Sequence, residues 1–219
     1  IRNVVRFYEM ADEVWIPQAS VEETLREYGY KGKVEVVDNG NDFADGAPIA
    51  ELRRVARETL KLSDDEMMFL FVGQHIWEKN LSFLLEALAR IKEQSFRMYF
   101  IGTGYAASEI KQKACELSLM DKITFVGNIT ERERLKRYYA AADLFLFPSL
   151  YDNAPLVVRE AAALHTPSLM IRDSTAAEII SDSSNGFLST NNVNAYAERI
   201  TELIRQPRLI TRVGDEASR

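Results

Sequence analysis

The chain has 219 residues, of which 47% are hydrophobic and 27% charged, so it has room for one large domain, or for one domain and part of a second. Its formal net charge of −6 excludes a globally basic surface of the kind that binds nucleic acid or anionic lipid. Cys115 is the single cysteine, which excludes an internal disulfide and a multi-cysteine metal site, and no apolar run reaches the ~18 residues that a transmembrane helix needs.

The first part of the chain predicts a small unit of two strands around a helix. The segments, in chain order, are a strand at residues 13–17, a helix at 20–28 and a strand at 34–37. Ser20 and Glu23 have the spacing of a capping box, so we expect them to begin the helix. The chain begins at Ile1 rather than Met, and its opening residues read like the interior of a domain, so we expect a fragment of a longer protein.

After a helix that Pro48 would open and that would run to about residue 60, strands and helices alternate regularly. Five near-continuous apolar runs predict strands, at residues 67–72, 97–101, 122–126, 144–148 and 168–171. Helices are predicted at residues 80–93, 106–117, 131–141, 156–164, 174–181 and 192–205. Apolar strands without alternation are typical of a parallel sheet covered on both faces, so the order predicts a doubly wound, Rossmann-like α/β fold.

In such a sheet, ligands bind beyond the carboxyl ends of the strands, so the loops there are the informative segments. The first loop runs from Gly73 and Gln74 to Lys79, where an ammonium group at a helix start would attract a phosphate. For that lysine taken alone, a capped loop with a solvated side chain is the simpler explanation. The second loop contains Gly102 and Gly104, a Gly-x-Gly string that indicates a close approach of the backbone to a phosphate or to other backbone.

The loop after the fourth strand carries the strongest signal. Asp152 lies in this loop, and Glu160 follows eight residues later on the predicted helix. The first amides of that helix, at Leu156 and Val157, would hold a diphosphate, and each carboxylate would accept hydrogen bonds from a vicinal diol. A helix start with an acidic cap and an ion-paired glutamate is the simpler explanation of the two acids alone. After the third strand, the backbone at Asn128 would meet a base or form only a tight turn.

Taken together, these loops resemble the C-terminal domain of the family-four retaining GT-B glycosyltransferases. The matching segments occur in the family's order and cover essentially the whole chain: residues 11–14, 39–42, 72–79, 101–104, 123–128, 152–160 and 185–188. The resemblance implies that residues 1–40 are a remnant of an N-terminal Rossmann-like domain with its linker. Residues 41–219 would then be the nucleotide-sugar-binding GT-B domain.

The resemblance also implies roles in a donor site. Lys79 would neutralise the diphosphate, Glu160 would hold the ribose hydroxyls, and Asp152 would hold hydroxyls of the transferred sugar. These three would be the catalytic residues. The full donor-binding set implied comprises Gly73, Gln74, Lys79, Gly102, Gly104, Asn128, Ile129, Asp152, Leu156, Val157 and Glu160. Asn128 and Ile129 would meet the base through the backbone.

The implied activity is retaining transfer of a hexose-type sugar from a UDP- or GDP-linked donor to a glycan or lipid acceptor. No metal and no cofactor is expected, because cationic side chains and helix dipoles would stabilise the leaving diphosphate. We expect a cytoplasmic protein, with peripheral membrane contact in the full-length protein and no nucleic-acid partner. Since the acceptor would bind the missing N-terminal domain, this chain alone would transfer sugar poorly.

The chain departs from the family pattern at several positions. Gln74 replaces an arginine, Asp152 a glutamate, Pro155 and His165 glycines, and Ser174-Thr175 a Gly-Gly pair. A non-catalytic, decayed transferase module is therefore an open alternative, which nucleotide affinity would separate from the enzyme. An epimerase or a phosphorylase of the same fold would need acid/base residues or a pyridoxal lysine, neither of which we can place. An NAD-dependent oxidoreductase has the weakest support, because it rests on residues 102–107 and lacks an acid at the end of the next strand.

The histidines and the cysteine could in principle bind a metal or take part in catalysis, but we expect them to have structural positions. His75 and His165 have no partners at metal-ligand spacing, so we interpret both as surface or loop histidines. We expect the Cys115 thiol to be buried or half-buried in a helix, which fits a reducing cytosol.

Overall fold

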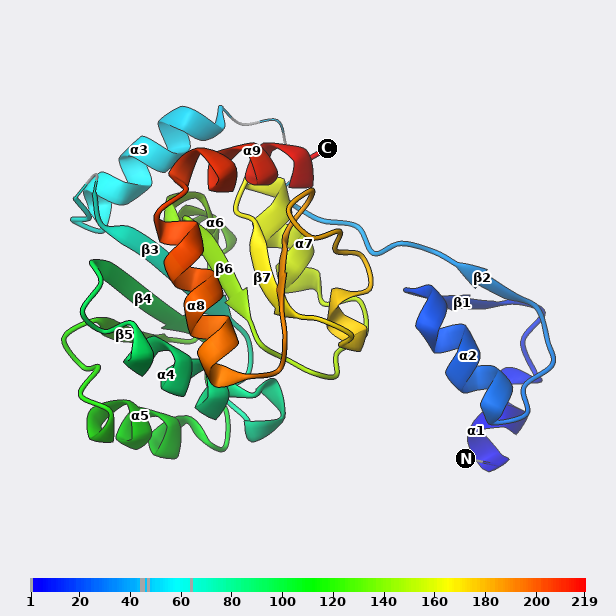
Figure 1. Ribbon diagram of the computed structural model, residues 1–219. Helices are drawn as coiled ribbons and strands as arrows, with labels where there is room; N and C mark the ends of the chain where they lie inside the picture. The colour runs from blue at the N-terminus through cyan, green and yellow to red at the C-terminus, as the bar shows by residue number, and fades with distance from the viewer. Residues whose placement is uncertain (1, 44–45, 47, 64) are drawn as a thin grey trace.

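The computed structural model describes residues 2–43, 46, 48–63 and 65–219. Its larger part, from residue 48 onward, is built on a parallel sheet with the strand order β5-β4-β3-β6-β7-β8 (Figure 1). The strands are β3 (Met67–Val72), β4 (Phe96–Ile101), β5 (Ile123–Gly127), β6 (Leu144–Phe147), β7 (Ser168–Ile171) and β8 (Phe187–Ser189). Every pairing between them is parallel, which confirms the predicted doubly wound α/β sheet.

Helices cover both faces of this sheet (Figure 1). We call the sheet together with its helices, from residue 48 onward, the sheet domain. They are α3 (Ile49–Thr59), α4 (Leu81–Arg90), α5 (Ala107–Glu116), α6 (Arg132–Ala141), α7 (Leu156–Ala163), α8 (Val193–Ile204) and α9 (Pro207–Ala217). Contacts join α4 to α5 and α8 in one layer, and α6 to α3 and α7 in the other. This two-sided cover explains why the strands lack polar residues at alternate positions.

Phenylalanine side chains fill the centre of the sheet domain. Phe71 stacks on Phe147 with ring centroids 6.0 Å apart, and Phe147 stacks on Phe145 at 5.7 Å. Phe100 stacks on Phe125 at 5.2 Å, at the edge of the same cluster. Burying a phenylalanine ring fully contributes about 1.5–3 kcal/mol, so the buried rings of this cluster, which come from β3, β4 and β6, contribute much to the stability of the domain.

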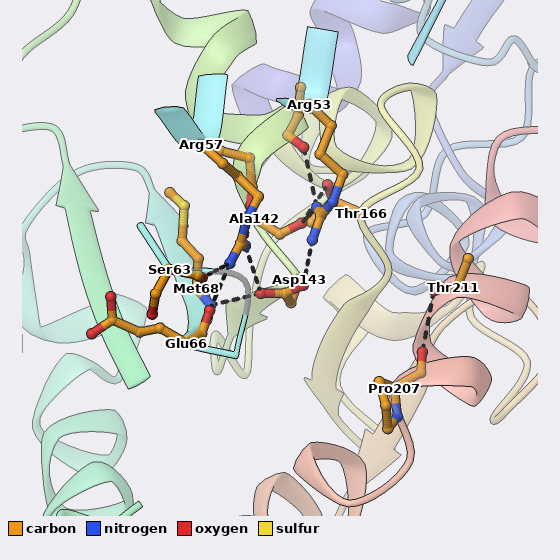
Figure 2. Close-up of polar contacts among 12 residues, drawn as sticks. Arg53, Arg57, Ser63, Glu66, Met68, Ala142, Asp143, Thr166, Pro207 and Thr211 are labelled. Carbon is orange, nitrogen blue, oxygen red and sulfur yellow. Dashed lines mark hydrogen bonds and ion pairs between the residues drawn. The ribbon is translucent and has the colours of Figure 1, made fainter. Parts of the chain in front are cut away.

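A polar network ties α3 to the amino ends of the strands. Figure 2 shows Arg53 and Arg57 of α3 converging on Asp143, which lies just before β6. The Asp143 carboxylate also accepts a hydrogen bond from the backbone N–H of Met68 at 2.7 Å. The Arg57 guanidinium also donates hydrogen bonds to the carbonyl oxygens of Ser63 and Glu66, at 2.7 and 2.8 Å. The network lies at the opposite end of the sheet from the loops that carry the predicted site.

Residues 2–37 form a smaller unit, the N-terminal segment, which lies to one side of the sheet domain (Figure 1). It contains α1 (Arg2–Tyr8), β1 (Val14–Ile16), α2 (Ala19–Glu27) and β2 (Val34–Val36), with β1 and β2 parallel. Its buried cluster is small and consists of Val5, Val14, Ile16, Leu25 and Tyr30. The two predicted strands and the helix between them are thus present.

Three expectations about local structure are wrong. Helix α2 has Gln18 at its N-cap and no side-chain cap, because Ser20 lies inside the helix and its Oγ accepts a hydrogen bond from Gln18. The predicted helix at 174–181 is only the 3₁₀ turn η2 (Thr175–Ala177), after which the Asn185 side chain bonds the backbone of Ile179 and Ser181. Cys115 lies on α5 but is exposed.

Helices α1 and α9 were not predicted from the sequence. Among the described residues, no helix combines the length and the apolar character that crossing a bilayer requires.

Candidate functional site

The loops after β3 and β4 pack against each other at the carboxyl edge of the sheet. Gly102 has a φ of +127°, and a Cβ there would overlap the carbonyl oxygen of Gly73. A Cβ on Gly104 would overlap the carbonyl oxygen of His75. Two backbone hydrogen bonds cross the contact, from His75 N to Thr103 O at 3.0 Å and from Ala106 N to His75 O at 3.1 Å. The Gly-x-Gly string therefore serves a close approach of backbone to backbone.

His75 lies in a loop, as expected, but it is not at the surface, because only 2% of its area is exposed. Its ring meets the rings of Phe100 and Phe125 edge-on, each with centroids 6.1 Å apart. Burial lowers the pKa of the His75 imidazole below its ordinary value, so the ring is neutral at pH 7. Among the described residues, its Nε2 has no hydrogen-bond partner. The imidazole therefore supports the two loops from within the core.

Lys79 and Asp152 are brought together from loops that are 73 residues apart. Lys79 ends the 3₁₀ helix η1 (Trp77–Lys79), and its ammonium group lies 2.5 Å from Oδ2 of Asp152. Both side chains are about four-fifths buried, with 18% and 23% of their areas exposed. The backbone N–H of Asp152 donates to Oγ1 of Thr175 at 3.0 Å, which ties this loop to the loop after β7. The pair thus offers a cation and a carboxylate side by side at the sheet edge.

The carboxylate of Glu160 is engaged by two partners that the sequence analysis did not assign to it. Oε1 lies 2.8 Å from the guanidinium of Arg132, and Oε2 accepts a hydrogen bond from the Tyr139 hydroxyl at 2.8 Å. Burial, together with the charge of Glu160, raises the pKa of Tyr139 well above its ordinary value, so the phenol remains a donor. Arg132 also lies over the Phe43 ring at 4.2 Å. A ligand hydroxyl would have to share Glu160 with this half-exposed arginine.

The start of α7 presents two backbone amides. The N–H of Ala154 donates to the side chain of Gln18 at 2.5 Å, Pro155 has no N–H, and the N–H of Val158 bonds the carbonyl of Pro155 at 3.1 Å. Within the described part of the chain, the amides of Leu156 and Val157 have no such partner. These are the positions where the positive end of a helix favours an anion.

The remaining predicted residues lie in loops on the same edge. Gln74 is exposed in the loop after β3, Asn128 is exposed just after β5, and Ile129 is half-buried against the core. Gly127 accepts a hydrogen bond from Gly102 at 2.9 Å, which joins the third of these loops to the second. The loops after β3, β4 and β5 therefore form one connected set, and the Lys79–Asp152 pair joins them to the loop after β6.

A model of the family described as glycosyl transferases group 1 matches residues 53–219 of this chain. The chain belongs to this family. A D-inositol 3-phosphate glycosyltransferase of Streptomyces avermitilis is 30% identical over 211 residues, which cover 90% of this chain and 45% of that protein. An α-monoglucosyldiacylglycerol synthase of Streptococcus pneumoniae is 27% identical over 217 residues, covering 94% of this chain and 48% of that protein. This glycosyltransferase chain thus spans about half the length of the curated relatives it matches.

Solved structures agree with this assignment. Sucrose-phosphate synthase from Thermosynechococcus elongatus superposes with a TM-score of 0.85 at 27% identity, over 95% of this chain and 53% of that one. HepE of Anabaena, solved in complex with UDP and glucose, superposes with a TM-score of 0.85 at 20% identity, over 99% of this chain and 60% of that one. The second likeness is one of fold. The Rossmann-like GT-B architecture of this glycosyltransferase domain is therefore shared with both.

Proposed function

We propose that this chain is the donor-binding part of a retaining glycosyltransferase that moves a hexose-type sugar from a UDP- or GDP-linked donor to a glycan or lipid acceptor. The observation that carries the proposal is the Lys79–Asp152 ion pair, because the Asp152 loop leads directly into α7, where the amides of Leu156 and Val157 have no hydrogen-bond partner among the described residues. A cation, two helix-end amides and a carboxylate are the groups that a sugar diphosphate requires.

The donor would rearrange this pair as it binds. The diphosphate would take the ammonium group of Lys79 together with the amides of Leu156 and Val157, and Asp152 would turn to hydroxyls of the sugar. The same positive groups would stabilise the charge that develops on the leaving diphosphate, so no metal or cofactor is invoked. Glu160 would accept hydrogen bonds from ribose hydroxyls once the Arg132 guanidinium has moved away from Oε1 of Glu160.

The other parts of the predicted site have lesser roles in the proposal. The backbone at Asn128 and Ile129 would meet the base, with exposed Gln74 beside the diphosphate in place of a charged residue. Gly102 and Gly104 would act by keeping the loops after β3 and β4 close to each other, because a Cβ on either would overlap a carbonyl oxygen of the other loop. Gly73 would supply one of those carbonyl oxygens.

The names of the relatives support the substrate classes. One relative is named for a diacylglycerol-linked glucose and one for inositol phosphate, and HepE was solved with UDP and glucose. We propose the same broad classes for this chain, acting at the cytoplasmic side of a membrane in the full-length protein. Residues 1–40 would belong to a second Rossmann-like domain that binds the acceptor, and residues 41–219 to the donor domain, so the chain alone would transfer sugar slowly.

Calorimetric titration of the chain with UDP, GDP and ADP, and with their glucose or mannose conjugates, tests the proposal. We expect one base to be preferred, with a dissociation constant on the order of 0.1–1 mM, because the chain spans about half the length of its curated relatives and would supply only part of the cleft. Lys79→Ala should weaken binding about tenfold, since it removes the charge beside the diphosphate. Lys111→Ala, which removes an exposed lysine on α5, is the matched control and should leave binding unchanged.

Absence of nucleotide binding would favour the alternative that the chain is a non-catalytic module. The structural observation that supports this alternative is that the carboxylates of Glu160 and Asp152 already pair with side chains of the protein. A folded chain that binds none of the nucleotides, while the full-length protein also binds none, would contradict the donor-site proposal.

A further inference from the structure

Gln18 is a buried polar residue of the N-terminal segment that reaches the candidate site. It lies between β1 and α2, and only 4% of its area is exposed. Its Oε1 accepts a hydrogen bond from the backbone N–H of Ala154 at 2.5 Å, across 136 residues of sequence. Its Nε2 donates to the carbonyl oxygen of Thr175 at 3.3 Å and to Oγ of Ser20 at 2.7 Å. One amide group thus joins the N-terminal segment to two loops of the sheet domain.

The loop that Gln18 holds is the one that carries Asp152. The backbone of Asp152 exchanges hydrogen bonds with Oγ1 of Thr175, at 3.0 and 3.2 Å, and the carbonyl of Ala154 accepts from the Asn39 side chain at 3.3 Å. Both backbone polar groups of Ala154 are therefore bound by residues that precede the sheet domain. Thr175 is in turn held by Gln18 from the other side.

The backbone of this loop needs such support. Ala154 has a φ of +45°, in the left-handed region that residues with a Cβ seldom adopt. Such a conformation persists where surrounding contacts determine it, and the contacts here are the bonds from Gln18 and Asn39. Without them the loop would relax, and Asp152, two residues away, would leave its place beside Lys79.

We propose that Gln18 is a positioning residue of the donor site: by bonding Ala154 and Thr175, it sets the place of Asp152 and so couples binding of the donor sugar to the N-terminal segment. The proposal rests on the proposed function, in which Asp152 holds the sugar and Lys79 the diphosphate. Gln18 itself would contact neither the sugar nor the diphosphate. Its loss should therefore weaken binding of the sugar more than binding of the nucleotide.

Two variants separate hydrogen bonding from packing. Gln18→Met keeps the shape of the side chain and removes both the acceptor and the donor. Gln18→Glu keeps an acceptor for the Ala154 N–H and loses the donor to Thr175. Gln112→Met, the same change at an exposed position on α5, is the matched control. All are made in the 219-residue chain, with thermal unfolding measured to show that each variant is folded.

The first readout is hydrogen exchange of the Ala154 amide without ligand, and the second is calorimetry with UDP and UDP-glucose. We expect Gln18→Met to speed exchange at Ala154 at least tenfold, and to weaken UDP-glucose about five- to tenfold but UDP less than twofold. Gln18→Glu should recover part of the Ala154 protection and of the UDP-glucose affinity, because its carboxylate accepts from the Ala154 N–H but is repelled by the carbonyl oxygen of Thr175. Gln112→Met should match the unaltered chain in both.

Two results would overturn the inference while the unaltered chain still binds donor. One is unchanged exchange at Ala154 in Gln18→Met, which would show that Gln18 does not hold the loop. The other is an equal loss of UDP and UDP-glucose affinity, or none, which would leave Gln18 a purely structural role. If neither the unaltered chain nor the full-length protein bound any of the UDP, GDP or ADP probes or their sugars, the proposed function would be refuted, and the positioning role with it.

Discussion

At the scale of single residues, the sheet domain depends on Asp143 for the attachment of α3. Its carboxylate pairs with Arg53 and Arg57 and accepts the Met68 N–H, and the Arg57 side chain is only 11% exposed (Figure 2). Removing the Asp143 carboxylate leaves the Met68 N–H without its acceptor and leaves the largely buried Arg57 guanidinium without its counter-charge. Asp143→Ala should therefore lower the free energy of unfolding by about 2–4 kcal/mol, as measured by urea denaturation.

A matched control is available on the solvent side of the same helix. Glu58 pairs with Arg54 across an exposed turn of α3, where solvent screens both charges. Glu58→Ala should change the unfolding free energy little. If Asp143→Ala proved equally harmless, the network around Asp143 would not be what attaches α3 to the strands.

The site residues differ in how far the chain alone reveals them. Lys79 and Asp152 were predicted for the same edge because both follow strands of one parallel sheet, and the structure brings them into contact. The partners of Glu160 were missed. Arg132 and Tyr139 lie on a different helix, and their residue types indicate a solvated basic face and an aromatic core as readily as they indicate partners for a carboxylate.

At the scale of elements, the two glycine-containing loops after β3 and β4 are a single structural unit. Gly102→Ala would force a Cβ into the carbonyl of Gly73 and a positive φ on a residue that resists it. We expect a loss of at least about 2 kcal/mol in unfolding free energy, together with faster amide exchange at His75.

Gly40→Ala is the control for that substitution. A Cβ at Gly40 would meet nothing within 4 Å, and its φ lies outside the left-handed region. It should leave stability nearly unchanged. Equal effects of the two substitutions would show that backbone approach is not the reason for Gly102.

Element boundaries were predicted well where one local signal dominates. Helix α8 begins after Asn192, whose side chain accepts a hydrogen bond from the Ala195 N–H at 3.0 Å, and it was predicted within one residue at each end. The helix predicted at 174–181 fails because the Asn185 side chain and a bridge between Asp182 and Gly186 turn the chain toward β8. Those contacts are polar bonds between a side chain or the backbone and nearby backbone groups, and a pattern of apolar residues does not reveal them.

At the scale of the whole molecule, the two parts of the chain have hydrophobic clusters of very different size. The N-terminal segment buries five apolar side chains, and Phe7, Met10 and Trp15 remain exposed by 71%, 84% and 68%. The sheet domain buries an extended aromatic and aliphatic core around β3 and β4. The free energy of opening should therefore be lower in the N-terminal segment.

Amide hydrogen exchange of the intact chain tests this difference. Amides of β1 and α2 should exchange much faster than those of β3 and β4. The reason is that only five buried apolar side chains stabilise β1 and α2, whereas an extended core stabilises β3 and β4. Similar protection of both pairs would mean that contacts with the sheet domain, such as those of Gln18, stabilise the segment as strongly as a core would.

The order of residues by itself determined the class of fold and the sheet edge at which the candidate site was predicted, and its loops resembled the family to which the chain belongs. Each depends on signals that are local along the chain: apolar runs of strand length, glycines and acids at short spacings, and helix starts after strands. Only the tertiary structure decided that Glu160 is held by Arg132, that His75 is buried and that Gln18 bonds Ala154. Those contacts join residues 28 to 136 positions apart or depend on burial by other strands, so no local pattern encodes them.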